Sequence, residues 1–173
     1  MRFVAIAAAL ALVAGSAFAQ EGAPNDAQIA HIVVTANQVD IDAGKLAESK
    51  ATNPEVKKFG ELMVKDHTAV NKQATELAKK LGVKPEDNAT SRSLAQGGRD
   101  NLAHLRELKK GPEFDKAYVD HEVAYHQAVI GAVDKTLIPS AKNAELKDLL
   151  VKTRPAFVAH LDHAKMLQAK LGK

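Results

Sequence analysis

The residues of this sequence that most directly indicate chemistry are the adjacent pair Asp66 and His67. They lie in a stretch, 56–81, whose apolar side chains recur at the spacing of one buried helix face, and they take the place of an apolar residue on that face. At about 100° per residue, the two side chains lie on either side of the apolar line. Burying such groups without partners costs about 1–3 kcal/mol or more. We therefore expect other core residues to bind them.

Four more residues with the same chemistry fall on the inner faces of other predicted helices: Asp40, Glu122, His126 and His160. Counted from the nearest turn, Asp40 is level with His67, and His126 is level with His160. Both pairs lie near the middle of their helices. We therefore expect the two pairs within one or two helical turns of each other, a turn being about 5.4 Å.

Three imidazoles and up to three carboxylates from four helices are what a metal site in a helix bundle needs. Carboxylates supply negative charge and can bridge ions, and imidazoles suit iron, copper, zinc or nickel. The alternative is a structural network in which neutral histidines form hydrogen bonds with the acids. The Glu-x-x-His motif of di-iron bundles is absent from the sequence, which disfavours an oxidase. The candidate metal ligands are His67, His126, His160, Asp66, Glu122 and Asp40.

Helical periodicity predicts four main helices that position these residues, and strand signals are weak throughout. The predicted ranges are about 26–49, 53–81, 111–137 and 143–171. Asn53 and Pro54 favour a helix start, and Gly82 favours a helix end. The short connection between the first two helices predicts an antiparallel hairpin. Pro155 is expected to kink or loosen the last helix.

A connection of about thirty residues, 82–111, separates the two pairs of helices. Its segment 88–93 is polar and turn-like, and Gly97 and Gly98 are expected to interrupt the residues after that segment. Spaced leucines still predict a short amphipathic helix up to Lys110. An up-down-up-down bundle would need only a short loop here. The prediction is therefore an all-α, ferritin-like four-helix bundle of two antiparallel hairpins joined by a long, partly helical crossover.

The two predicted hairpins resemble copies of each other, offset by 90 residues. The Asn-x-Glu-x-Lys start at 53–57 aligns with 143–147, and the Lys-Leu-Gly end at 80–82 aligns with 170–172. The remaining histidines are predicted to lie at the rim or the surface of the bundle: His31, His104, His121 and His163.

The segment 1–19 has the features of a secretory signal peptide, with an alanine-rich apolar run and an Ala-x-Ala site ending at Ala19. We expect cleavage after Ala19, a periplasmic location and a mature chain, 20–173, that forms one domain without a transmembrane segment. The chain of 173 residues has a formal net charge of +3 and no cysteine. Disulfides and a lipid-modified cysteine are therefore excluded. The charge is balanced and aromatic residues are few, so a nucleic-acid partner is not expected.

Several short motifs occur together over almost the whole mature chain: Ala43–Ala47, Asn53–Val56, Met63–Thr68 with Asn71, Phe114-Asp115 with Tyr118, Val123 with His126-Gln127, and Pro155 with His160-Leu161. Through them the sequence resembles the extracytoplasmic, ferritin-like domain-of-unknown-function family of bacteria (DUF4142 type), whose members are often labelled outer-membrane proteins. The resemblance implies a four-helix, ferritin-like fold in the periplasm and no established reaction.

The family's recurrent polar positions match Asp66, His67, His126 and His160 in this sequence. Asp40 stands where the resemblance implies glutamate, and Glu122 stands where it implies glutamine. The first difference shortens a candidate ligand, and the second creates one.

Two functions remain as hypotheses. The first is an exported, metal-binding ferritin-like protein for sequestration, sensing or stress protection, whose ion would be iron, copper or zinc. The second is a non-catalytic envelope protein with a structural polar core that acts by protein–protein interaction. A third, minor hypothesis is an oxidase-type enzyme. The candidate partners are a metal ion, a second copy of the chain and another envelope protein.

Overall fold

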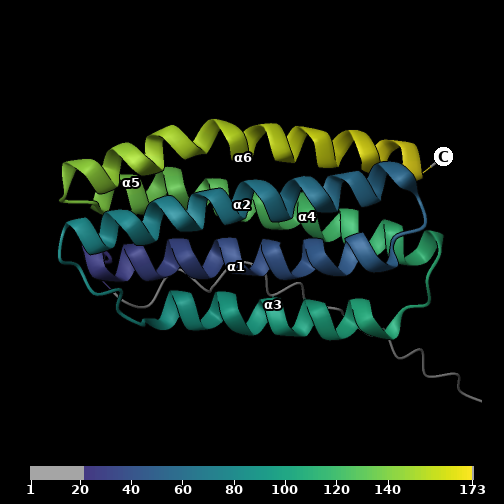
Figure 1. The fold of residues 1–173 in the computed structure, drawn as a ribbon, viewed down its shortest axis with the longest axis horizontal. Helices are drawn as coiled ribbons and strands as arrows, with labels where there is room; N and C mark the ends of the chain where they lie inside the picture. The colour runs from purple at the N-terminus through teal and green to yellow at the C-terminus, as the bar shows by residue number, and fades with distance from the viewer. Residues whose placement is uncertain (1–21, 173) are drawn as a thin grey trace, which may run out of the picture.

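A computed structural model describes residues 22–172, and every regular element in that range is helical (Figure 1). The predicted signal peptide, 1–19, lies outside the described residues. The elements are α1 (Asp26–Lys50), α2 (Pro54–Lys80), α3 (Ala89–Glu107), α4 (Pro112–Ala132), the π-helical turn η1 (Val133–Leu137), α5 (Ile138–Ser140) and α6 (Ala144–Leu171).

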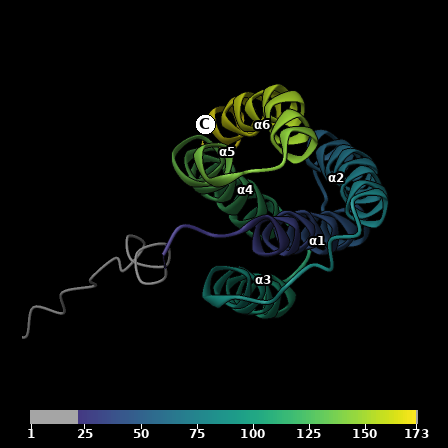
Figure 2. The ribbon, with the colours of Figure 1, turned by 90° about the vertical axis from the view of Figure 1, so that its left-hand side faces the viewer.

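Four long helices surround the core, and they form two antiparallel hairpins. In the end-on view of Figure 2, α1, α2, α6 and α4 follow one another around the bundle, and α3 lies outside, beside α1. Helix α3 is the crossover, because it returns along the length of α1 and joins the end of α2 to the start of α4 (Figure 1). The predicted all-α bundle with a long, partly helical crossover is confirmed.

The crossover helix α3 is longer than predicted at its start. The segment expected to be turn-like forms its first turn, because Asn88 and Ser91 form a capping box. The Asn88 side chain accepts from the Ser91 N–H at 3.0 Å, and the Ser91 hydroxyl oxygen accepts from the Asn88 N–H at 3.1 Å. The helix ends at Glu107 rather than Lys110.

The interruption expected at Gly97 and Gly98 does not occur, because both glycines lie inside α3. A Cβ atom added at Gly98 would lie 2.7 Å from a methyl carbon of Val39 on α1, whereas one at Gly97 would meet nothing within 4 Å. Gly98 therefore allows α3 to approach α1 closely.

These two glycines give a matched pair of substitutions. Gly97→Ala should raise the free energy of unfolding by about 0.5–1 kcal/mol, because alanine favours the helix at an open position. Gly98→Ala should lower it, because the new methyl group must displace the buried, β-branched Val39. Chemical denaturation of both variants measures the difference, and equal effects would contradict the close α1–α3 contact.

The second hairpin contains a widened turn that the sequence did not predict. Its first helix was expected to run to Leu137. In the structure α4 ends at Ala132, and the helical path goes on through η1 and α5 as far as Ser140. At the end of η1, the Ile138 N–H donates to the Val133 carbonyl oxygen, five residues earlier, which is the π-helical pattern. Helix α6 continues through Pro155 without ending.

Two kinds of contact, helix caps and ion pairs between the hairpins, repeat with the 90-residue offset. Asn53 and Asn143 each cap the helix that follows, by accepting from the N–H groups two and three residues later. Lys80 pairs with Glu145, and Lys170 pairs with Glu55 at the opposite end of the bundle. The predicted repeat is therefore present in the contacts as well as in the sequence.

Each hairpin also holds the turn of the other through a carboxylate. Asp115 on α4 accepts from the backbone N–H groups of Thr52 and Asn53 at 3.0 and 2.7 Å, and from the Thr52 hydroxyl at 2.7 Å. Asp26 on α1 accepts from the backbone N–H groups of Lys142 and Asn143. These carboxylates fix how the two hairpins are aligned along the bundle.

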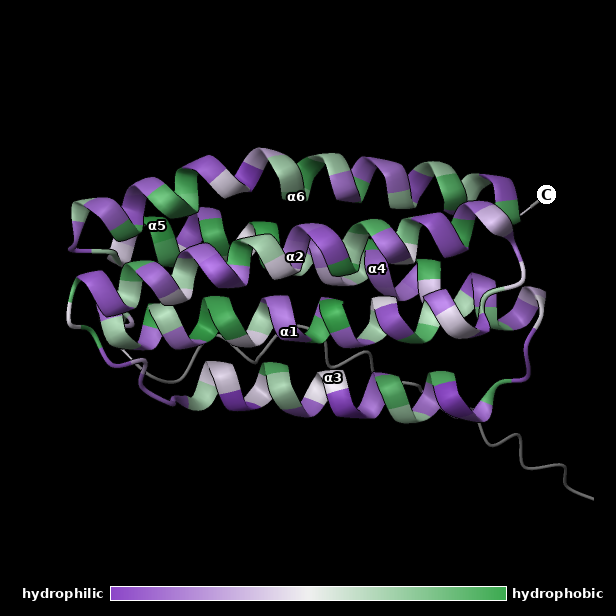
Figure 3. Ribbon diagram, viewed as in Figure 1, coloured by the Kyte–Doolittle hydropathy of each residue, from purple (hydrophilic) through white to green (hydrophobic). Residues whose placement is uncertain are grey.

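Hydrophobic and hydrophilic residues alternate around every long helix (Figure 3), as expected of helices with one buried face. The buried apolar side chains form two clusters. One contains Phe59 and Met63, and the other contains Ile29 and Leu150. The three buried histidines of the bundle's centre, His67, His126 and His160, lie between the two clusters in chain order. None of the helices in the described part of the chain has the length and apolar character of a membrane span.

Candidate metal centre

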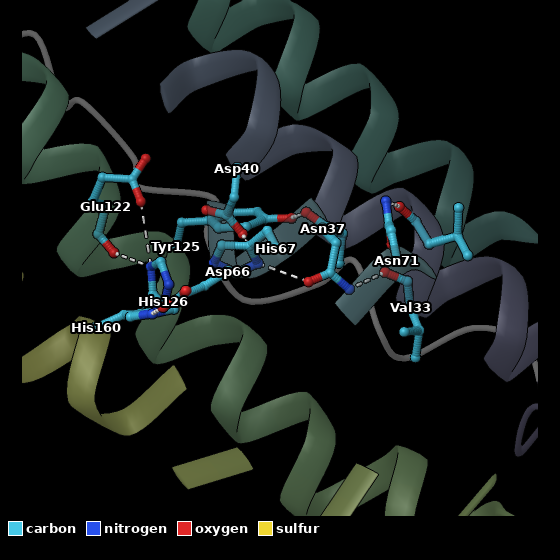
Figure 4. A network of polar contacts seen from close by, with 12 residues as sticks. Val33, Asn37, Asp40, Asp66, His67, Asn71, Glu122, Tyr125, His126 and His160 are labelled. Carbon is cyan, nitrogen blue, oxygen red and sulfur yellow. Dashed lines mark hydrogen bonds and ion pairs between the residues drawn. The ribbon is translucent and has the colours of Figure 1, made fainter. Parts of the chain in front are cut away.

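His67, His126 and His160 come together in the centre of the bundle, from α2, α4 and α6 respectively (Figure 4). Their ring centroids are 5.2–5.6 Å apart, and one ring nitrogen from each lies within 4.8 Å of the others. The three residues are only 2, 1 and 4% exposed. These ring distances lie within the one or two helical turns that the sequence predicts between the two pairs.

His67 is oriented by Asn37, a residue that the sequence analysis did not select. The Asn37 amide nitrogen donates to the Val33 carbonyl oxygen at 2.7 Å, so the amide oxygen faces His67. That oxygen lies 2.7 Å from His67 Nδ1, and a carboxylate oxygen of Asp40 lies 3.5 Å from the same nitrogen. Because the Asn37 amide oxygen can only accept, Nδ1 carries the proton and Nε2 keeps its lone pair.

The same reasoning applies to the other two rings. His126 Nδ1 lies 3.0 Å from the Glu122 carbonyl oxygen, so Nδ1 donates and Nε2 keeps its lone pair. His160 Nε2 lies 3.0 Å from a carboxylate oxygen of Asp66, so Nε2 donates and Nδ1 keeps its lone pair. Each imidazole therefore has one nitrogen held by an acceptor and one that can bind a cation.

The three nitrogens that keep their lone pairs are buried, and no group in residues 22–172 forms a hydrogen bond with them: His67 Nε2, His126 Nε2 and His160 Nδ1. Burial, together with the two neighbouring histidines, lowers the pKa of His67 to about 2. Burial also lowers the pKa of His126 to about 4 and lowers that of His160. All three rings are therefore neutral at physiological pH, which is the form that binds metal ions.

Two buried carboxyl groups adjoin the histidines. Asp40 and Glu122 form a second group of ligand atoms with His126, again within 4.8 Å of one another. One Glu122 oxygen lies 3.4 Å from His126 Nδ1, and one Asp40 oxygen has no hydrogen-bond partner among the described residues. Burial raises the pKa of Glu122 to about 8, and burial together with the charge of Glu122 raises the pKa of Asp40 well above its usual value. A bound cation would compensate the cost of ionising them.

Asp66 lies outside both groups of ligand atoms. Its side chain is 35% exposed, and its role in the structure is the hydrogen bond to His160. Five of the six candidate residues thus lie in the two groups, and the sixth orients one of the five. A carboxylate that accepts from the second nitrogen of a histidine is the usual companion of a metal-binding imidazole.

Aromatic rings close the site on two sides. The Phe157 ring is stacked on the His67 ring at 5.4 Å between centroids, with an interplanar angle of 4°. The Tyr125 ring meets His126 edge-on at 6.4 Å, and the Tyr125 hydroxyl donates to the Ala36 carbonyl oxygen at 3.1 Å. These rings limit the movement of two of the three imidazoles.

Sequence reasoning missed Asn37, although a signal for it exists. The inner face of α1 contains Val33, Ala36 and Asp40, and position 37 falls within the same arc at helical spacing. The other four histidines lie outside the two groups: His104 is exposed, and His31, His121 and His163 are half-buried. His31 is thus less exposed than predicted.

Comparison with known proteins identifies the family of this chain. No curated protein and no solved structure matches the chain significantly. The model of the family described as "domain of unknown function (DUF4142)" matches residues 11–167. The chain therefore belongs to the DUF4142 family.

Proposed function

We propose that this protein binds one transition-metal ion in the centre of its bundle, through His67 Nε2, His126 Nε2 and His160 Nδ1. The observation that supports this most strongly is the set of three neutral imidazoles, each with one nitrogen held by an acceptor and the other buried without a partner among residues 22–172. Metal-binding histidines have this arrangement, because the second nitrogen fixes the tautomer and the ring orientation.

The alternative, a purely structural polar network, accounts less well for these atoms. A structural network stabilises a core only when its members are satisfied. Here the three buried ring nitrogens of the site lack hydrogen-bond partners in the described residues. Each unpaired buried polar atom costs about 1–3 kcal/mol. A cation bound by the nitrogens and balanced by Asp40 and Glu122 would remove most of that cost.

Three imidazoles suit zinc or copper, and nearby carboxylates extend the choice to iron. Three protein ligands leave a further coordination position open, as in sites where a metal binds water or a small molecule. We propose that the protein is exported to the periplasm and there sequesters or senses such an ion. Mass spectrometry of the native protein should find an N-terminus at or near Gln20.

The test is metal content and stoichiometry. Protein purified from the periplasm should contain close to one ion per chain by elemental analysis. After treatment with a chelator, titration with Zn²⁺, Cu²⁺ and Fe²⁺ should reach saturation at one ion per chain for at least one of them. Sub-stoichiometric binding of every ion would favour the second hypothesis, an envelope protein with a structural polar core.

Asp66 provides a more specific prediction. Replacing it with alanine should weaken metal binding by about 10- to 100-fold, because His160 then loses the acceptor that fixes its tautomer. Isothermal titration of the chelator-treated protein measures the change. Asp162, on the same helix as His160 and exposed, is the control: Asp162→Ala should leave the affinity unchanged.

A further inference from the structure

A small apolar cavity lies beside the polar cluster. It has a volume of about 30 Å³ and is lined mainly by apolar side chains of α1, α4, η1 and α6. Ile32, Val133 and Leu150 form part of its wall, and all three are buried. At one end it is bounded by Asn37, Asp40 and His67.

The 90-residue repeat explains why this space exists. Residues Ile32, Ala36 and Phe157 take the positions that correspond to Glu122, His126 and His67. The bundle therefore has a polar half and an equivalent apolar half at the same level. Since alanine at position 36 is much smaller than the histidine at the equivalent position, the apolar half is not completely filled.

The volume and the lining decide what can occupy the cavity. A cavity needs a volume of about 10–15 Å³ to hold one molecule the size of water. The cavity therefore has room for about two atoms of that size. Cavities lined by apolar side chains stay dry and bind apolar molecules or xenon. The Thr153 hydroxyl in the lining donates to backbone carbonyl oxygens of its own helix. The other polar groups lie at one end, where His67 Nδ1 and Asn37 are paired with each other and one Asp40 oxygen is unpaired among the described residues.

A wider groove lies outside this cavity, between α3 and α4. It has a volume of about 170 Å³, and Gly97, His121 and Tyr125 form part of its lining. Leu94 and Val129 line both the groove and the inner cavity. Ile32, Val133 and Leu150 in the cavity wall are buried, whereas Leu94 and Val129 are only half-buried. They are the two side chains that separate the groove from the cavity.

We infer that the inner cavity binds an apolar molecule of about two heavy atoms, the size of a diatomic gas, next to His67, and that this molecule enters from the α3–α4 groove past Leu94 and Val129. The occupancy of the cavity does not depend on the metal ion.

Xenon is the probe for this inference, because it is apolar and can be located in crystals by its anomalous scattering. Crystals of the full mature chain under xenon pressure should show one atom between Ala36, Val133 and Phe157. Ala36→Leu should abolish that site, because the larger side chain fills the space. Val133→Phe serves as a second variant if Ala36→Leu does not fold. An ordered pair of waters in place of xenon, or xenon bound equally in the filled variants, would overturn the inference.

The entry route is tested separately by xenon exchange in solution, measured by ¹²⁹Xe NMR. Leu94→Ala should make exchange faster and Leu94→Trp should make it slower, with occupancy retained in both. Gln73→Ala is the control and should leave exchange unchanged, because Gln73 is exposed on α2 and lines neither the groove nor the cavity. Exchange rates that do not respond to either change at Leu94 would refute the route through the α3–α4 groove.

The experiment is done on chelator-treated and on Zn²⁺-treated protein, which separates the two claims. Xenon binding without any metal binding would support the cavity and contradict the proposed function. Metal binding without xenon in either form would support the proposed function and contradict the cavity.

Discussion

Replacing His160 with leucine is expected to abolish the rise in melting temperature that a bound metal ion gives the wild-type chain. An ion present at 1,000 times its dissociation constant stabilises the folded state by about 4 kcal/mol. For a domain of this size that corresponds to a rise of roughly 10 °C. Without His160 Nδ1 only two imidazoles remain, and both the affinity and the rise should be lost.

The same substitution should leave the metal-free protein as stable as the wild type or make it more stable. Leucine removes a buried nitrogen that has no partner among residues 22–172, and it adds apolar surface to the core. The lost hydrogen bond costs little, since Asp66 is partly exposed and can bind water instead. A stable variant that does not respond to metal is therefore the expected result.

His163→Leu is the matched control on the same helix. His163 is half-buried, and its ring lies 5.0 Å from that of Phe59, outside both groups of ligand atoms. The rise in melting temperature that metal gives the His163→Leu variant should equal the rise in the wild type. Thermal melts of the three proteins, each with a chelator and with divalent ions, decide the question. Equal losses in both variants would show that the ligand set is wrongly assigned.

The largest loss of stability from a single polar substitution is expected at Asp115. This carboxylate is 1% exposed and accepts three hydrogen bonds from Thr52 and Asn53. Asp115→Ala leaves two backbone N–H groups at a helix start without partners, at a cost of about 2–4 kcal/mol in the free energy of unfolding. Urea denaturation of the metal-free protein measures this cost.

Asp26→Ala is the internal comparison, because Asp26 holds the equivalent turn of the other hairpin. Asp26 is only half-buried, so water can reach the N–H groups of Lys142 and Asn143 once the carboxylate is removed. We expect a loss of about 1 kcal/mol or less. A larger loss at Asp26 than at Asp115 would contradict this account of how the hairpins are aligned.

The level of each polar residue along the bundle could be predicted from the sequence. The Asn53 and Asn143 caps fix where α2 and α6 begin, and a helix then advances by a constant rise per residue. Counting from those caps placed Asp40 opposite His67 and His126 opposite His160, and the structure confirms both pairs.

The start of α3 and the state of each ring nitrogen could not be predicted in the same way. Asn88 and Ser91 favour turns and helix starts alike, and which one forms depends on the hydrogen bonds that they make. The free nitrogen of His67 depends on Asn37, and Asn37 in turn on Val33. Such a chain of contacts is set by side-chain rotamers within the packed core, which hydrophobic periodicity does not specify.

The proposal of a metal centre is tested most directly by locating the ion. Crystals of the chelator-treated protein reloaded with Zn²⁺ should give an anomalous difference peak, at X-ray energies just above the zinc absorption edge, at bonding distance from His67 Nε2, His126 Nε2 and His160 Nδ1. The Zn–N distances should be about 2.0–2.1 Å. The absence of a peak among these three rings, or a peak only at surface residues, would contradict the proposal.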